Sequence, residues 1–519
     1  MSNFVILLSK IANSPYSIRH LGNSHRKRRA AAKMLVLKLP IKFGRRHIVA
    51  FHCFFGMVIS YAMRFCLSIA ITEMTSMPLS KEDNKTCPLP HDYYTKATMK
   101  ETEFNWTGSQ QGVVNSAFFW GYVFGHIPGG VAADKFGGRK IVTLGAFFTG
   151  VFSILSPYAA KMFGWLGLVA VRIFVGLSQG LFYASTHTVV GQWIPKEERG
   201  TLGTFIFSGV HIGNALNMLF SGVFLYYTQH RWDLLFVIYG VIGVVWSLCF
   251  FFTTYDTPAD HPFLSQYEKN ILKTKVKSES EATIKPPKKT PWKSILKSLP
   301  VWAAAIAMIG HDFGLFAMIT DLPKFFKTVL HFSIKNNGAL NALTFILIWV
   351  VGIFAGILSD YVDNHNIISV TANRKIGTTL ASLLPSLGFI SSVYVGCDTT
   401  LATVCLLVGQ AFMGFYYPSL KVNTIDLSTN FAGTVSSMVV TVGSLSGAVV
   451  PYLIGSLTPN NSISEWRIVM WITFAVMSVT NVFYIIFASG ELQPWDDVEE
   501  NTVQKSPSTR SRTGTLKNI

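Results

Sequence analysis

The sequence predicts an all-α membrane protein with twelve transmembrane helices arranged as two six-helix halves. Half of the 519 residues are hydrophobic and only 14% are charged, which is too few to cover the surface of a soluble protein of this length. Apolar stretches of about 20 residues, each long enough to cross a bilayer as a helix, recur along the whole chain. The 41 glycines fit this class, because small residues let membrane helices pack closely.

The apolar stretches define the spans and the segments between them. We place the spans at residues 47–72, 111–133, 140–160, 165–193, 201–227, 233–254, 301–320, 336–360, 375–396, 400–424, 433–456 and 466–488. The chain then divides into a basic N-terminal arm (1–46), a first half (47–254) with a polar outer loop (73–110), a Pro/Lys-rich linker (255–300), a second half (301–488) and a tail (489–519).

The distribution of charge predicts the orientation of these spans. The net charge is +17, and the basic residues gather in the N-terminal arm, the central linker and the tail. This is the positive-inside pattern of a membrane protein, so we expect both termini in the cytoplasm, a lipid bilayer as partner and no nucleic acid. We see no acidic dileucine signal in the arm, which favours the plasma membrane over a lysosomal or vesicular one.

Sequons and cysteines concern the same outer loops. Three N-glycosylation sequons begin at Asn84, Asn105 and Asn460, and all fall in predicted outer loops. We expect modification at Asn84 and Asn460, because Asn105 abuts the second span. Of the six cysteines, Cys87 and Cys397 also fall in outer loops, and whether they pair is left open.

An internal repeat supports the division into halves. "GVAADKFGGRK" follows the second span, from Gly130 to Lys140, and "GILSDYVD…NRK" follows the eighth, from Gly356 to Lys375. Both place a glycine one helical turn before an aspartate (Asp134 or Asp360) and end in a basic pair. The glycine allows close packing of two helices, and the aspartate can bond a helix N-terminus and pair with the following basic residues, such as Arg139. We interpret Gly130, Asp134, Arg139, Gly356 and Asp360 as a cytoplasmic gate, against the alternative of ordinary solvated turns.

Four longer strings point to a family. They are "FFWGYVFGHIPGG" (118–130), "QWIPKEERGTL" (192–202), "YDTPADHP" (255–262) and "FASGELQPW" (487–495). With the Gly130–Lys140 loop, they resemble the anion/cation symporter family of the major facilitator superfamily, which includes sialin, the vesicular glutamate transporters and the type I sodium/phosphate cotransporters. The resemblance implies a twelve-helix fold with a central site that opens alternately to either side of the membrane.

Two isolated arginines lie in the middle of apolar spans. Arg64 is in "GMVISYAMRFCLSIAIT" and Arg172 is in "VAVRIFVGLSQG". A charge near the bilayer centre costs at least about 3 kcal/mol and is usually there for function. A guanidinium binds carboxylate or phosphate through two parallel hydrogen bonds, so both arginines, with Tyr61 nearby, are candidate contacts for an anionic substrate. The family resemblance implies the same role for the two arginines.

Polar residues at helical spacing extend this candidate site. Arg172, Gln179, Tyr183 and His187 share one face of the fourth span, and Asn115, Tyr122 and His126 share one face of the second. Such faces predict a water- or substrate-lined cavity. A weaker row of His211, Asn214 and Asn217 in the fifth span fits either a cavity or helix–helix hydrogen bonds.

The coupling ion follows from departures from the family. By resemblance, the proton-coupled branches carry a glutamate at the Gln179 position, and the glutamate branch has a histidine at Asn115 and an arginine at His311. Gln179 and Asn115 cannot titrate, which favours Na⁺ over H⁺ as the coupling ion. The candidate coupling groups are Asp312, His311, His126 and His187.

The sequence therefore predicts a secondary active transporter of a small anion, inorganic phosphate or an organic anion, and not an enzyme. Sodium coupling is favoured, and we expect no cofactor, no metal site and a monomer. Three alternatives stay open: a proton-coupled sialin-like carrier of organic acids, a non-transporting membrane sensor and an anion channel.

Overall fold

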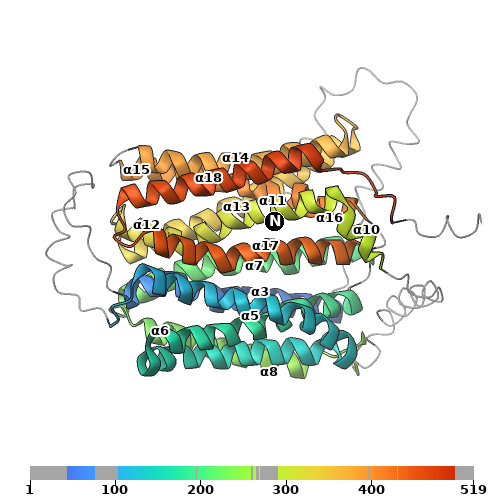
Figure 1. Ribbon diagram of the computed structural model, residues 1–519. Coiled ribbons are helices and arrows are strands. Elements are labelled where there is room, and N and C mark those ends of the chain that lie inside the picture. Colours follow the sequence, from blue (N-terminus) through green and yellow to red (C-terminus); the bar gives the residue numbers. More distant parts are fainter. Residues whose placement is uncertain are drawn as a thin grey trace, which may run out of the picture. The chain divides into compact units, whose positions relative to one another are not determined.

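The computed structural model describes residues 44–75, 103–194, 196–258, 261, 262, 264, 268, 290–395, 398–428 and 431–496. From Arg46 onward these residues belong to one compact unit. Apart from one isolated bridge between Thr75 and Phe104, the regular structure within these ranges is helical (Figure 1).

The first half contains five helical elements that provide six spans. They are α3 (Arg45–Met74), α5 (Gly108–Phe136), α6 (Gly138–Trp193), α7 (Lys196–Tyr227) and α8 (Trp232–Thr253). α6 counts twice, because Gly164 has φ 64° and interrupts it between two spans. Gly137, with φ 100°, separates α5 from α6 in the predicted gate loop.

The second half begins after a short helix, α10 (Trp292–Lys297). Its six spans are α11–η3–α12 (Leu299–Phe316, Ala317–Asp321, Leu322–Thr328), α13 (Ile334–Asn364), α14 (Val370–Tyr394), α15–η4–η5–α16 (Thr399–Ala411, Phe412–Tyr416, Tyr417–Lys421, Val422–Asp426), α17 (Ala432–Leu457) and α18 (Ile463–Phe487). The predicted twelve-helix fold is therefore confirmed.

Local signals explain where several helices begin. Thr107 and Gln110 form a capping box at the start of α5, and Ser462 and Glu465 form one at the start of α18. Within the spans the helices satisfy their own backbone groups, as a bilayer requires. By length and composition, nine helices in the described part of the chain are apolar enough to cross a membrane.

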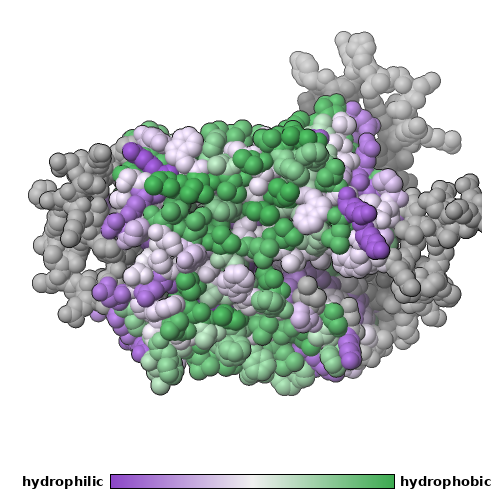
Figure 2. Space-filling view, viewed as in Figure 1, coloured by the Kyte–Doolittle hydropathy of each residue, from purple (hydrophilic) through white to green (hydrophobic). Residues whose placement is uncertain are grey.

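The surface agrees with a membrane environment. Figure 2 shows an apolar middle on the viewed face, with hydrophilic residues gathered at both ends of the helices. Apolar side chains of the helices, such as Phe124, Met162 and Val479, are each at least 69% exposed on the protein surface. Since burial inside the protein does not cover them, lipid is the solvent that suits these surfaces.

The two halves meet along two pairs of helices, α5 with α17 and α7 with α13. We refer to the two ends of the helices as the Glu73 end, where α3 stops, and the Asp426 end, where α16 stops. Close backbone approaches between the halves lie toward the Glu73 end. A Cβ added at Gly222 of α7 would come 2.9 Å from the backbone of Gly338 of α13, so only glycine permits this contact.

Candidate anion-binding site

Arg64 lies in an aromatic cage in the middle of α3. Its side chain is almost fully buried, and within the described residues it has no ion pair and its Nε has no hydrogen-bond partner. Its Cζ lies 4.5 to 5.4 Å from the centroids of five rings, which belong to Tyr61, Phe65, Phe118, Phe119 and Tyr122. Ring faces stabilise a cation without neutralising it. The charge of Arg64 therefore stays available to an anion.

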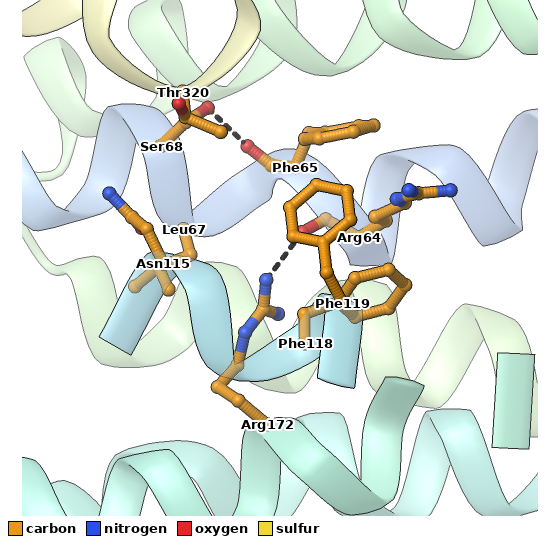
Figure 3. Close-up of a pocket in the computed structure, with 9 residues that line it drawn as sticks. All are labelled: Arg64, Phe65, Leu67, Ser68, Asn115, Phe118, Phe119, Arg172 and Thr320. Atoms are coloured by element: carbon orange, nitrogen blue, oxygen red, sulfur yellow. Dashed lines mark hydrogen bonds between the residues drawn. The ribbon is translucent and has the colours of Figure 1, made fainter. Parts of the chain in front are cut away.

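Arg172 and Gln179 hold α6 against α3. The Nη2 of Arg172 donates a hydrogen bond of 2.6 Å to the carbonyl of Arg64, as Figure 3 shows. The Nε2 of Gln179 donates an equally short bond, 2.6 Å, to the carbonyl of Ser60, one turn earlier in α3. The predicted polar face of this span thus has a positioning role at these two residues, because both bind backbone oxygen atoms of the helix that carries Arg64.

We expect Gln179→Glu to give uptake a new dependence on pH. A protonated carboxyl can donate to the Ser60 carbonyl as the amide does, whereas a carboxylate can only repel it. Uptake by the variant should fall about tenfold as the pH is raised through the titration of that carboxyl, the cost of an unsatisfied buried group. The measurement is initial uptake against pH, with Gln179→Met as the variant that loses the bond but cannot titrate. A pH profile identical to that of Gln179→Met would contradict this role.

A small cavity lies beside the two arginines and between the halves (Figure 3). Its volume is about 10 Å³, which is room for about one water molecule. The first half contributes most of its lining, including Ser68 and Asn115, and the second half contributes Thr320. Since an inorganic phosphate is several times larger than a water molecule, binding such an anion here requires the halves to move.

The remaining aromatic and histidine candidates form a row of rings. Tyr122 lies 5.4 Å from His126, His126 lies 5.6 Å from Tyr183, and Tyr183 lies 5.3 Å from His187, between ring centroids. His187 is exposed, whereas His126 and Tyr183 are half-buried. The structure thus brings these four predicted residues together, in a row that begins at the Arg64 cage.

His311 and Asp312 lie on the other side of the interface, in α11. The His311 ring stacks on Tyr416 with centroids 4.0 Å apart. The Asp312 carboxyl is buried and interacts electrostatically with Arg64 of the first half and with Lys421 of the second. Its charge therefore acts on cations of both halves.

The seventh span is longer than predicted and therefore includes additional charged residues. We expected it to end at residue 320, but the helix continues through a π-helical turn, Ala317–Asp321, to Thr328. Asp321 and Lys324 are therefore buried inside it. The Asp321 carboxylate accepts a hydrogen bond of 2.5 Å from Thr320, and the Lys324 ammonium donates one of 3.0 Å to Thr458. Hydropathy missed this turn because these charged residues ended the apolar run.

The predicted gate loops differ between the two halves. In the first, the Arg139 backbone N–H donates to Asp256 over 3.0 Å and its guanidinium donates to the carbonyl of Phe251 over 2.9 Å. Gly130 and Asp134 lie in α5, and the side chain of Asp134 is outside the described residues. Asp256 belongs to the "YDTPADHP" string, so that motif anchors the start of α6.

In the second half, the expected pairing of an aspartate with the basic pair is made by other residues. Arg374 pairs with Asp363 at 3.1 Å and with Asp426 at 2.7 Å. Asp360, one turn after Gly356 in α13, is exposed instead. Ser359 and Asp363 are four residues apart on one face of α13 and both contact Arg374, whereas Asp360, the residue after Ser359, is turned 100° away from Ser359.

An ion pair and a hydroxyl contact join the halves at the Glu73 end, and the sequence reasoning missed both. Glu73 of α3 is buried and its carboxylate contacts Lys327 of α12 at 3.0 Å and His230 at 2.5 Å. The hydroxyls of Ser109 in α5 and Ser456 in α17 lie 3.3 Å apart. These contacts must break if this end opens.

His211 makes a contact between the halves at the middle of α7. Its Nε2 lies 2.5 Å from the hydroxyl of Tyr417 in η5, while Asn214 and Asn217 of the same row are fully buried. Asn217 accepts a hydrogen bond from Ser221 of its own helix. The His211 contact is a hydrogen bond between helices, as one of the two interpretations of this row predicts, whereas the Asn217 bond stays within α7.

The outer-loop predictions fall partly outside the described residues. Asn84, Cys87 and Cys397 lie there. Asn460 is exposed just after α17, and its side-chain amide donates a hydrogen bond of 2.9 Å to Glu465.

The comparisons with known proteins decide the family. Residues 53–451 match the model of the Major Facilitator Superfamily. The chain belongs to the major facilitator superfamily. Among solved major facilitators, it matches an inward-facing bacterial homolog of the human lysosomal transporter Spinster with a TM-score of 0.64 and a D-xylose–proton symporter with 0.63. Both are 14% identical to this chain. The Spinster homolog aligns with 87% of this chain and the xylose symporter with 86%, and in both cases 99% of the solved chain is aligned.

Curated relatives place the chain more narrowly among major facilitators. It is 33% identical to a Drosophila melanogaster protein named "Putative inorganic phosphate cotransporter", over 91% of this chain and 92% of the relative. It is 30% identical to human sialin (88% and 92%) and to human vesicular glutamate transporter 2 (89% and 77%). The resemblance to the anion/cation symporter family is confirmed, and so is the assignment as a transporter rather than an enzyme.

Proposed function

We propose that this chain moves a small anion, inorganic phosphate or an organic anion, across a membrane by alternating access. The observation that carries the proposal is Arg64, a buried cation whose neighbours are aromatic rings, next to a cavity between the two halves. An anion entering there gains a bidentate partner in a medium of low dielectric. The names of the phosphate cotransporter and sialin relatives support the same substrate class.

The proposal includes an orientation and a location. With both termini in the cytoplasm, the Glu73 end faces outward and the Asp426 end faces inward. The contacts between the halves at the Glu73 end then close the outer side of the protein, as in an inward-facing conformation. We propose a monomer in the plasma membrane, glycosylated at Asn84 and Asn460; the exposure of Asn460 supports the second site.

We propose Na⁺ as the coupling ion and Asp312 as the carboxylate that senses it. A carboxylate oxygen is a ligand that Na⁺ accepts, and Asp312 is buried beside the interface between the halves. Asp312 interacts electrostatically with Arg64. When an anion binds Arg64, the positive charge of Arg64 no longer balances the negative charge of the Asp312 carboxylate. A sodium ion would then restore the balance, which couples binding of the two ions.

A second candidate is a proton-coupled carrier of organic acids. The specific observation in its favour is His126, a titratable group whose ring contacts Tyr122 of the Arg64 cage. His187 lies at the exposed end of the same row and offers a path for the proton.

The experiment that tests the function is uptake by the purified full-length chain in proteoliposomes. Labelled phosphate, sialate, urate and glutamate are offered with an imposed sodium gradient or an imposed proton gradient, each applied alone. Saturable uptake of an anion, driven by one gradient, supports the transporter. Absence of uptake for every anion, or uptake that never saturates, would refute it.

We expect Asp312→Asn to remove the sodium dependence of uptake. The amide keeps the shape of the side chain but loses the charge that attracts Na⁺. The ratio of uptake in sodium to uptake in choline should fall from about tenfold toward one, the loss of one charge-assisted contact. Asp321→Asn is the matched control, since Asp321 is a second buried aspartate of the same span, and we expect it to keep the sodium dependence. Sodium dependence that survives in Asp312→Asn would transfer the role to another group.

A further inference from the structure

Lys421 is a cation of the second half that faces the interface between the halves. It ends the π-helical turn Tyr417–Lys421 of the tenth span, about 7 Å from the Asp426 end by helical rise. Its side chain is exposed, and within the described residues it forms no ion pair. Its ammonium lies 5.6 Å from the centroid of the Tyr417 ring, the ring whose hydroxyl contacts His211 of the first half.

Lys421 also interacts with charged and titratable groups of both halves. It interacts electrostatically with Asp312 of α11, and its charge acts on His187 of α6 and on His211 of α7. Two of these three residues belong to the first half. Its ammonium also lies over the Tyr417 ring, whose hydroxyl contacts His211 of the first half, so Lys421 lies at the interface between the halves.

The charge balance of this space is positive. Arg64 and Arg172 contribute two cations from the first half, Lys421 contributes one from the second, and Asp312 is the carboxylate that acts on both Arg64 and Lys421. With Asp312 ionised and no Na⁺ bound, these four side chains sum to two positive charges. A monoanion leaves one of them uncompensated in a medium of low dielectric, whereas a dianion compensates both.

We propose that Lys421 is a substrate-binding residue that makes the site selective for dianions, which it binds together with Arg64. A dianion between the two would hold one cation of each half, so its binding would also favour the approach of the halves at the Asp426 end. The ligand class is an anion with two negative charges, either a tetrahedral oxyanion or a dicarboxylate. This proposal rests on the proposed anion transport and adds to it the charge of the substrate.

The test measures binding to the purified full-length chain through the rise in its thermal unfolding midpoint, without requiring transport. The probes are sulfate and succinate as dianions, with methyl sulfate and monomethyl succinate as monoanions of the same frames. For the wild type, we expect the half-effective concentration of a dianion to be about tenfold below that of its matched monoanion. If only sulfate raises the unfolding midpoint, the ligand class is a tetrahedral oxyanion, and if only succinate does, it is a dicarboxylate. Either result supports the proposal.

Variants of Lys421 decide the assignment. Lys421→Gln and Lys421→Met should weaken dianion binding about tenfold and change monoanion binding less than about threefold, whereas Lys421→Arg should keep the selectivity. The matched control is Lys335→Gln, because Lys335 is also exposed and also lies over a tyrosine ring, at 5.7 Å from Tyr226.

Two outcomes would overturn the proposal: a wild type that does not distinguish dianions from monoanions, or neutral Lys421 variants that keep the wild-type selectivity. Failure of the proposed transport function is a separate result. It would appear as a wild type that takes up no anion in proteoliposomes, whatever the binding measurement shows for Lys421.

Discussion

Arg64→Lys is expected to reduce anion uptake by at least about a hundredfold, the scale of losing one charge-assisted bidentate contact in a buried site. Lysine keeps the charge but presents no planar fork to an oxyanion. The structure adds a second reason. Five rings surround the weakly hydrated guanidinium of Arg64, and a compact, strongly hydrated ammonium would be poorly solvated among them. The measurement is the initial rate of uptake in proteoliposomes at equal amounts of reconstituted protein.

A matched control separates the loss of this site from a general effect of replacing arginine. Arg467 of α18 also lies over a tyrosine, 5.1 Å from the Tyr394 ring, but near the Glu73 end and away from the cavity. Arg467→Lys should keep wild-type uptake. Uptake by Arg64→Lys at the rate of Arg467→Lys would rule out Arg64 as the anion-binding residue.

Cross-linking the Glu73 end is expected to stop transport almost completely. The hydroxyls of Ser109 and Ser456 lie 3.3 Å apart on helices of different halves, so cysteines at both positions can form a disulfide with little backbone movement. The bond would hold together the two helices, α5 and α17, that must separate if this end opens. Uptake by Ser109→Cys/Ser456→Cys should fall to background under oxidation and return after reduction.

The single variants Ser109→Cys and Ser456→Cys are the controls, because the chain has six cysteines of its own. Each should transport normally under oxidation. Binding of the anion from the Asp426 side should survive in the cross-linked protein, since the bond lies at the other end. Unimpaired turnover by a fully cross-linked protein would show that this end does not open during transport.

Much of the fold could be predicted from the sequence, for a physical reason. A bilayer requires each span to be an apolar helix that satisfies its own backbone hydrogen bonds. The number and positions of the spans can therefore be predicted from the local amino-acid composition. The gate loop at Gly137 and the capping box at Thr107 are local signals as well. The seventh span departs from this rule, because its π-helical turn carries Asp321 and Lys324 into the protein interior, where partners rather than hydropathy decide their burial.

The candidate site was predictable only in its chemistry. An arginine in the middle of an apolar span costs free energy of membrane insertion, so its presence there indicates a functional site. This applies to Arg64 and Arg172 alike. Their different roles depend on packing: Arg172 donates to the Arg64 carbonyl, 108 residues earlier in the chain, while Arg64 keeps its charge among rings.

The sequence by itself determined the fold class, the order of the spans and the cationic character of the candidate site, which suits an anion. The tertiary structure alone decided which charges meet across the two halves. Glu73 and Lys327 are 254 residues apart, and the charge of Lys421 acts on histidines of the other half. Periodicity and composition describe each helix separately, whereas these contacts depend on how the two halves pack together.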